Sequence, residues 1–162
     1  MTMVPSERVP AAGTTRRPPR IDHRVRLADA RDLSRLHEIA AESYPSFTTD
    51  LAALQQEESL FVAEWRTALD GFIVLLPLHD AILVHRLAIA ADMRRRGLGG
   101  WLLDFATHHA RTAGLAGVEI QVSDSDRVRI AWLQRLGFAP MTPTGNRTLL
   151  RRPAQHGRDI KP

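Results

Sequence analysis

The pattern of apolar and polar positions divides the chain into strand-like and helix-like segments. Short runs rich in branched or aromatic residues are typical of strands, and apolar residues recurring every three to four positions indicate one face of a helix. The strand-like segments are residues 25–27, 60–65, 72–78, 81–90, 118–122, 138–141 and 147–150. The helix-like segments run from Asp29 to Pro45, from Thr49 to Glu57, from Leu98 to Gly114 and from Asp124 to Gly137.

The order of these segments predicts a mixed α+β fold. Two early helices are followed by a meander of antiparallel strands, and then strands and helices alternate. This order indicates a central mixed, mostly antiparallel sheet of six to seven strands with about four helices on its faces. Asp70-Gly71 is a typical hairpin turn, so we expect it to join strands 60–65 and 72–78. In the last helix, the spacing of Val128, Trp132 and Leu136 predicts a shared buried stripe.

The charge distribution separates a folded domain from two tails. The chain has 162 residues and a formal net charge of +4. Residues 1–24 and residues 151–162 each carry +3, which leaves −2 for residues 25–150. We therefore expect a disordered basic N-terminal tail (1–24), one domain (25–151) and a flexible C-terminal tail (152–162). Basic groups outside the domain, without aromatic residues among them, do not favour a nucleic-acid partner.

The composition excludes several classes of protein. No cysteine is present, so disulfides, thiolate zinc sites and thiol nucleophiles are excluded, and we expect no metal. The longest apolar run before a proline, Phe72 to Leu76, is far shorter than the ~18 residues that a membrane span needs. No membrane partner is expected, and a cytoplasmic location fits these features.

The most informative stretch is Arg94 to Gly100, which joins the strand-like run 81–90 to an amphipathic helix. A glycine turn before a helix directs unpaired N–H groups and the positive end of the helix dipole at one point, an arrangement suited to a pyrophosphate. A P-loop would need a lysine and a hydroxyl residue after its second glycine, where this chain has Gly100 and Trp101. A dinucleotide fingerprint would need a small residue at Leu102. An ordinary glycine-rich turn with solvated arginines remains the alternative.

The motif Arg94-x-x-Gly97-x-Gly99 resembles the acetyl-CoA signature of the GNAT superfamily of N-acetyltransferases. Further segments in the family's order extend this resemblance over residues 25–150. They are Val25–Asp32, Leu60–Glu64, Gly71–Ile73, His85–Ile89 and Arg135–Phe138.

The resemblance implies a site for acetyl-CoA as co-substrate, between two strands that separate at the centre of the sheet. The backbone of Leu87 and Ile89 would pair with the pantetheine arm, and the Ile89 N–H would stabilise the oxyanion. Backbone N–H groups of the glycine turn would hold the pyrophosphate, with arginine side chains adding charge. The implied cofactor-binding residues are Leu87, Ile89, Arg94, Arg95, Arg96, Gly97, Leu98, Gly99, Gly100 and Asp126.

His85 is our candidate for the general base that takes a proton from the amine. Its unperturbed pKa lies close to neutral pH, and period two predicts a face shared with Leu87 and Ile89. It also precedes Arg94 by nine residues, a spacing similar to that of a catalytic histidine in the arylalkylamine N-acetyltransferases. A histidine at the edge of the core is the alternative, and Glu64 and Asp80 are weaker candidates for the base.

The sequence departs from the family in the last helix. Leu133 stands where many members have a tyrosine that protonates the leaving thiolate, and Asp126 stands where an asparagine often contacts pantetheine. Asp126 is equally suited to cap the helix. Tyr44 and Phe47, in the loop that usually covers the acceptor, are candidate substrate contacts or packing residues.

The resemblance therefore implies transfer of an acetyl group from acetyl-CoA to an amine of a small molecule or protein, by direct attack in a ternary complex. A non-catalytic acetyl-CoA-binding or regulatory module with the same fold is the alternative. Homodimers are common in the family, although no apolar patch in this sequence demands one.

Overall fold

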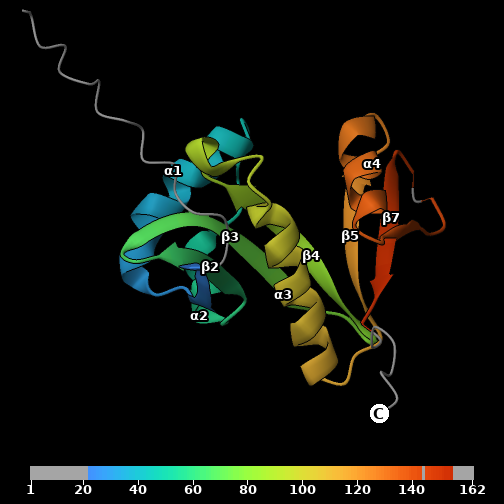
Figure 1. The fold of residues 1–162 in the computed structure, drawn as a ribbon, viewed down its shortest axis with the longest axis horizontal. Coiled ribbons are helices and arrows are strands. Elements are labelled where there is room, and N and C mark those ends of the chain that lie inside the picture. The colour runs from blue at the N-terminus through green and yellow to red at the C-terminus, as the bar shows by residue number, and fades with distance from the viewer. Residues whose placement is uncertain (1–21, 144, 155–162) are drawn as a thin grey trace, which may run out of the picture.

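A computed structural model of the chain describes residues 22–143 and 145–154 (Figure 1). Seven strands form one sheet in the order β1-β2-β3-β4-β5-β7-β6, and every neighbouring pair is antiparallel except β4 and β5, which are parallel. The strands are β1 (Arg24–Leu27), β2 (Leu60–Trp65), β3 (Ala68–Pro77), β4 (Ala81–Ile89), β5 (Gly117–Ser123), β6 (Ala139–Pro140) and β7 (Arg147–Pro153). The helices are α1 (Leu33–Ser43), α2 (Leu51–Gln56), α3 (Leu98–Thr112) and α4 (Arg127–Arg135). The mixed, mostly antiparallel sheet expected from the sequence is confirmed.

Helices cover both faces of this sheet. On one face, Phe61 of β2 packs against the rings of Phe105 and His109 of α3. Helix α4 lies on the same face, where it contacts the first turn of α3, and Figure 1 shows α3 crossing the sheet over β4 and α4 beside β5 and β7. Helices α1 and α2 pack on each other, and α1 buries Leu36 and Ile39 against β3 and β4.

The pairing of β4 with β5 is short, and this positions the site. Their register runs from Ala81 opposite Gly117 to Val84 opposite Ile120 and then stops. Beyond Val84 the two strands separate, while β4 continues to pair with β3 as far as Ile89. The second half of β4 therefore has one edge without a partner strand, as the resemblance implied.

The prediction of a hairpin turn at Asp70-Gly71 is wrong. Both residues lie inside β3, and the turn that precedes this strand contains Arg66, whose φ is +56°. Gly71 is needed for close packing rather than for a turn, since a Cβ there would lie 2.8 Å from the carbonyl oxygen of Ala88. Asp70 is buried and bonds the Nε2 of His23 at 2.8 Å.

Both boundaries of the folded domain also need correction. His23 is buried and Arg24 begins β1, so the fold includes residues that we assigned to the N-terminal tail. At the other end, β7 continues to Pro153, and Arg152 donates a 2.6 Å hydrogen bond to the Leu103 carbonyl of α3. The remaining tail residues, 1–21 and 155–162, lie outside the described residues.

The buried stripe of α4 also differs from the prediction. The Val128 side chain is 82% exposed, whereas Leu133 is fully buried in the core. Trp132 packs over Gly99, and Leu136 packs over Gly100, so both face α3 as the stripe required. The spacing identified the correct helix but not which side of its first turn faces the protein.

Candidate functional site

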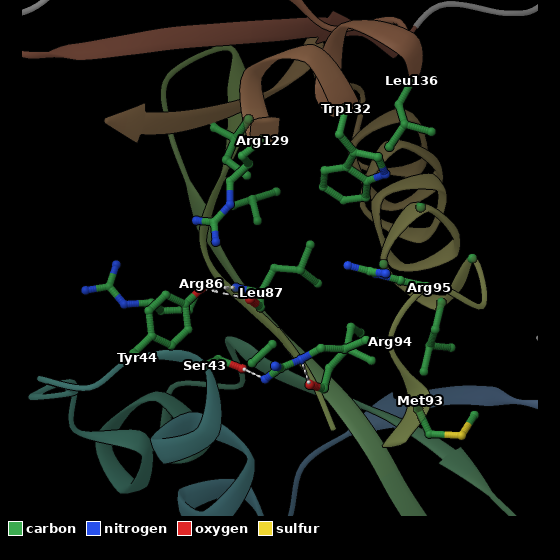
Figure 2. Close-up of a pocket in the computed structure, with 18 of the residues that line it drawn as sticks. Ser43, Tyr44, Arg86, Leu87, Met93, Arg94, Arg95, Arg129, Trp132 and Leu136 are labelled. Atoms are coloured by element: carbon green, nitrogen blue, oxygen red, sulfur yellow. Dashed lines mark hydrogen bonds between the residues drawn. The ribbon is translucent and has the colours of Figure 1, made fainter. Parts of the chain in front are cut away.

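A cavity of about 740 Å³ lies where β4 and β5 separate. Its wall is built from the end of α1, the second half of β4, the turn before α3, the first turns of α3, and parts of β5, α4 and β7. Figure 2 shows Tyr44 and Arg94 on one side of this cavity and Arg129 and Trp132 on the other, with Arg95 pointing into it.

The free edge of β4 points into the cavity. The hydroxyl of Tyr44 donates to the Leu87 carbonyl at 2.7 Å and accepts from the Leu87 N–H at 3.4 Å. Since both main-chain groups of Leu87 bond away from β3, those of Ile89, two residues later, point the same way. Arg94 indeed donates from Nε to the Ile89 carbonyl at 3.2 Å. In this structure two side chains thus bond the backbone groups that were assigned to the pantetheine arm.

The turn before α3 presents backbone N–H groups to the same cavity. Arg95 and Gly97 adopt left-handed backbone conformations, with φ values of +61° and +81°, and no side chain caps the helix. The first N–H groups of a helix have no acceptor within it. Gly97, Leu98, Gly99 and Gly100 all line the cavity, so the end of the helix that carries these donors forms part of its wall. This arrangement can hold an anion.

The three arginines of the motif differ in position. Arg94 lines the cavity, but its guanidinium also donates to the Glu42 carbonyl and to the Ser43 hydroxyl, each at 3.2 Å. It therefore ties the turn to the end of α1, a contact that the sequence did not indicate. The Arg95 side chain points into the cavity (Figure 2), whereas Arg96 is not among the lining residues.

A β-bulge in β4 places His85 on the cavity wall. Val74 of β3 opposes Arg86, and Leu75 opposes Val84, so His85 is an extra residue between two paired ones. At a bulge two residues of one strand oppose one residue of its neighbour. His85 therefore lies beside Arg86 and opposite Val74.

This bulge corrects the face predicted for His85. It interrupts the period-two alternation, so His85 does not share a face with Leu87 and Ile89. Burial, and secondarily the charge of Arg86, hold the pKa of His85 below its usual 6.5. The imidazole is consequently neutral at pH 7 and able to accept a proton.

The other candidate residues lie away from the cavity. The Phe47 ring packs 5.7 Å from that of Tyr44 and does not line it. Asp126 accepts from the Arg129 N–H at 3.1 Å and so caps α4. The weaker base candidates are engaged in ion pairs, Glu64 with two arginines of β1 and Asp80 with an arginine of β7.

Several lining residues were missed by the sequence analysis. They are Glu42, Ser43, Arg86, Gln121, Arg129 and Arg147. Arg86 could have been found from its place next to His85, but the others come from elements whose approach to β4 is set by tertiary packing. Within residues 22–143 and 145–154, no three metal-ligating side chains gather at one point. No helix in this part of the chain is long and apolar enough to cross a membrane.

Comparisons with known proteins agree with this geometry. The sequence matches the Acetyltransferase (GNAT) family over residues 27–138. No curated protein matches it. The structure is similar to Ard1 from Thermoplasma volcanium, with a TM-score of 0.73 and 20% identity over 84% of this chain and 100% of that one. It is also similar to the ribosomal-protein-S18-alanine N-acetyltransferase from Escherichia coli, with a TM-score of 0.68 and 19% identity over 86% and 98% of the two chains. A third similar structure is a GNAT family acetyltransferase from Elizabethkingia anophelis, solved with acetyl-CoA bound. Its TM-score is 0.64 and its identity 17%, over 82% of this chain and 99% of that one.

Proposed function

Because the chain belongs to the GNAT family of acetyltransferases, we propose that it moves an acetyl group from acetyl-CoA to an amine by direct attack in a ternary complex. The observation that carries this proposal is the meeting of two backbone features at one cavity. These are the edge of β4 at Leu87 and Ile89, which has no partner strand, and the N–H groups at the start of α3, which no side chain caps.

These features fit the two chemically distinct parts of acetyl-CoA. The N–H groups from Arg95 to Gly100, with the helix dipole behind them, suit the negatively charged diphosphate. The edge of β4 suits the amide groups of the pantetheine arm, which can pair with it as a further strand does. The Ile89 N–H then points at the thioester and stabilises the oxyanion that forms during attack.

The reaction needs no covalent intermediate on the protein. The amine nitrogen forms a bond to the carbonyl carbon, the carbon–sulfur bond breaks, and the sulfur leaves as a thiolate. His85 accepts the proton that the nitrogen loses, directly or through ordered water. Leu133 cannot donate a proton to the thiolate, but a thiol with a pKa of ~8.5 is a tolerable leaving group without one.

A non-catalytic acetyl-CoA-binding module is the second candidate. It is favoured by Leu133, which is buried and apolar at the position of the family's tyrosine, and by Asp126, which caps α4 outside the cavity. A module of this kind would bind acetyl-CoA without releasing CoA when amines are added, and replacing His85 would change nothing.

Thiol release from acetyl-CoA across a panel of amines tests the proposal, with calorimetric titration of acetyl-CoA in parallel. We expect binding, and CoA release that depends on one class of amine. Binding without release for any amine would favour the non-catalytic module, and the absence of binding would contradict both.

Removing the Tyr44 hydroxyl should strengthen acetyl-CoA binding. The hydroxyl bonds both main-chain groups of Leu87, so it competes with the pantetheine arm for them. A neutral hydrogen bond is worth about 0.5–1.5 kcal/mol, so Tyr44→Phe should lower the dissociation constant of acetyl-CoA by roughly twofold to tenfold. Calorimetry measures this, with Phe47→Leu as a control because Phe47 lies in the same loop but off the cavity. Weaker binding in Tyr44→Phe alone would show that the hydroxyl contacts the ligand.

The pH profile should report the lowered pKa of His85. As pH falls, His85 becomes protonated and loses its function as a base, so kcat/KM should decrease through a midpoint below 6.5. Arg86 is the secondary cause of the lowered pKa, so in Arg86→Gln this midpoint should move to higher pH. Profiles of the two proteins with the same acceptor check this. An identical midpoint in both would contradict the assignment of this limb to His85.

A further inference from the structure

Two arginines flank the opening between β4 and β5 on the face opposite α3. Phe61 packs on α3 and is paired with Ile73 of β3, so the Ile73 side chain lies on the α3 face of the sheet. The following residue, Val74, therefore points to the opposite face, and so does its partner Arg86. In β7 the side chain of Arg152 reaches α3. Side chains alternate between the two faces along this regularly paired strand, so Arg147, five residues earlier, points to the face opposite α3. Both Arg86 and Arg147 line the cavity.

Neither of these arginines forms an ion pair with any residue in the described part of the chain. Arg86 donates to the carbonyl of His85 at 2.7 Å and lies 5.7 Å from the centre of the Tyr44 ring. Among residues 22–143 and 145–154, Arg147 has no carboxylate within ion-pair distance, and the only arginines of β7 that form ion pairs there are Arg151 and Arg152. By contrast, arginines of other regions are matched with acids, as Arg26 is with Asp32 and Arg151 with Glu119.

The acidic residues of the cavity do not offset this charge. Glu42 accepts from the N–H of Ala91 at 2.9 Å, at the turn that follows β4. Asp104 lies on α3, on the other face, where it pairs with Arg152 at 3.3 Å. The face that carries His85, Arg86 and Arg147 therefore presents two uncompensated guanidinium groups beside the candidate base.

From this arrangement we propose that the acceptor is a primary amine that carries a carboxylate, bound by Arg86 and Arg147. The inference depends on the proposed acetyl transfer and names the class of amine. A guanidinium matches a carboxylate geometrically and in charge, and bonds it more strongly than a neutral group. The carboxylate held by the arginines directs the amino group of the same molecule towards His85 and the opening. A purely cationic amine is repelled by the same two charges.

Matched acceptor pairs in which an amide replaces a carboxylate at one kind of position, the α-carboxylate or the side chain, test this class. The pairs are glutamate and glutamine, aspartate and asparagine, alanine and alaninamide, and the peptides Ala-Glu-Glu-Glu and Ala-Gln-Gln-Gln, each assayed with the full-length protein and acetyl-CoA. The first three pairs probe a free amino acid and the last probes a peptide with acidic side chains. We expect at least one carboxylate to exceed its amide in kcat/KM by about tenfold to a hundredfold, the range for a charge-assisted hydrogen bond.

The variants Arg86→Gln, Arg147→Gln and their combination should remove this preference. We expect them to raise KM for the carboxylate acceptor, to leave the amide of the pair little affected in KM, and to leave the dissociation constant of acetyl-CoA unchanged. Arg127→Gln is the matched control, because Arg127 lies on α4 outside this cavity. Circular dichroism and acetyl-CoA titration verify that each variant is folded.

The outcomes separate this inference from the proposed function. No turnover with any amine would contradict the acetyl transfer itself. Turnover in which the amide equals its carboxylate in every pair, or in which cationic amines equal the carboxylates, would leave the transfer intact and overturn the inference. A carboxylate preference that survives in the double variant would also overturn it. If Arg147→Gln instead weakens acetyl-CoA binding, the arginine serves the phosphates of the coenzyme and the inference is again wrong.

Discussion

Replacing His85 with alanine should lower kcat/KM by about 10²–10⁴, the usual contribution of a positioned general base. His85 lies on the cavity wall at the bulge of β4, and burial holds its pKa below 6.5, so it is neutral and ready to accept a proton. Without it, the acceptor must lose its proton to solvent before attack. The remaining activity of His85→Ala should therefore rise with pH as the neutral fraction of the amine increases.

A second histidine provides the control for this experiment. His79 is exposed in the segment between β3 and β4 and does not line the cavity, so His79→Ala should leave the steady-state constants unchanged. Acetyl-CoA should bind His85→Ala as it binds the unaltered protein, since the histidine side chain is not needed for backbone recognition. If His85→Ala retains more than half of the original kcat/KM, the base must be another group or ordered water.

The elements that build the proposed cofactor side of the cavity could be predicted because they are encoded locally. The glycines of the turn before α3, the apolar run of β4 and the amphipathic pattern of α3 are each readable within a few residues. The strand β4, the glycine turn and the helix α3 follow one another in the sequence and also lie next to one another in the structure. This is why Leu87, Ile89 and the segment from Arg94 to Gly100 were named as one site and, apart from Arg96, all line one cavity.

The proposed acceptor side of the cavity could not be predicted because it depends on register and on long-range packing. The bulge at His85 is a property of the β3–β4 pair, and no residue type marks it in the sequence. Arg147 reaches the cavity only because β7 pairs with β5. The bond from Tyr44 to Leu87 joins residues that are 43 positions apart.

At Asp70-Gly71 the sequence indicated correctly that a glycine is required but assigned the wrong reason, a hairpin turn, because both residues lie inside β3. Glycine after aspartate usually supplies the positive φ of a hairpin turn. Here the φ of Gly71 is not positive, and the missing side chain instead lets β3 and β4 approach closely beside Ile89. Only the position of the neighbouring strand distinguishes these two reasons for a glycine.

Adding one methyl group at this position, in Gly71→Ala, should therefore destabilise the protein and disturb the site together. The new Cβ would lie 2.8 Å from the Ala88 carbonyl oxygen and 2.8 Å from Cδ1 of Ile89, so both the backbone of the β3–β4 pair and the Ile89 side chain must shift. Overpacking of this kind costs about 1–3 kcal/mol, which should lower the free energy of unfolding measured in urea. Because Ile89 carries the proposed oxyanion contact, kcat should decrease as well.

Gly100→Ala is the matched control for the change in stability. A Cβ at Gly100 would be in ordinary contact with Leu136 at 3.5 Å, and alanine favours a helix over glycine by about 0.5–1 kcal/mol. The two variants add the same methyl group and should change the free energy of unfolding in opposite directions. If Gly71→Ala is as stable as the unaltered protein, then β3 and β4 can separate without cost at this point, and the backbone of Ile89 is not held rigidly enough to orient a thioester.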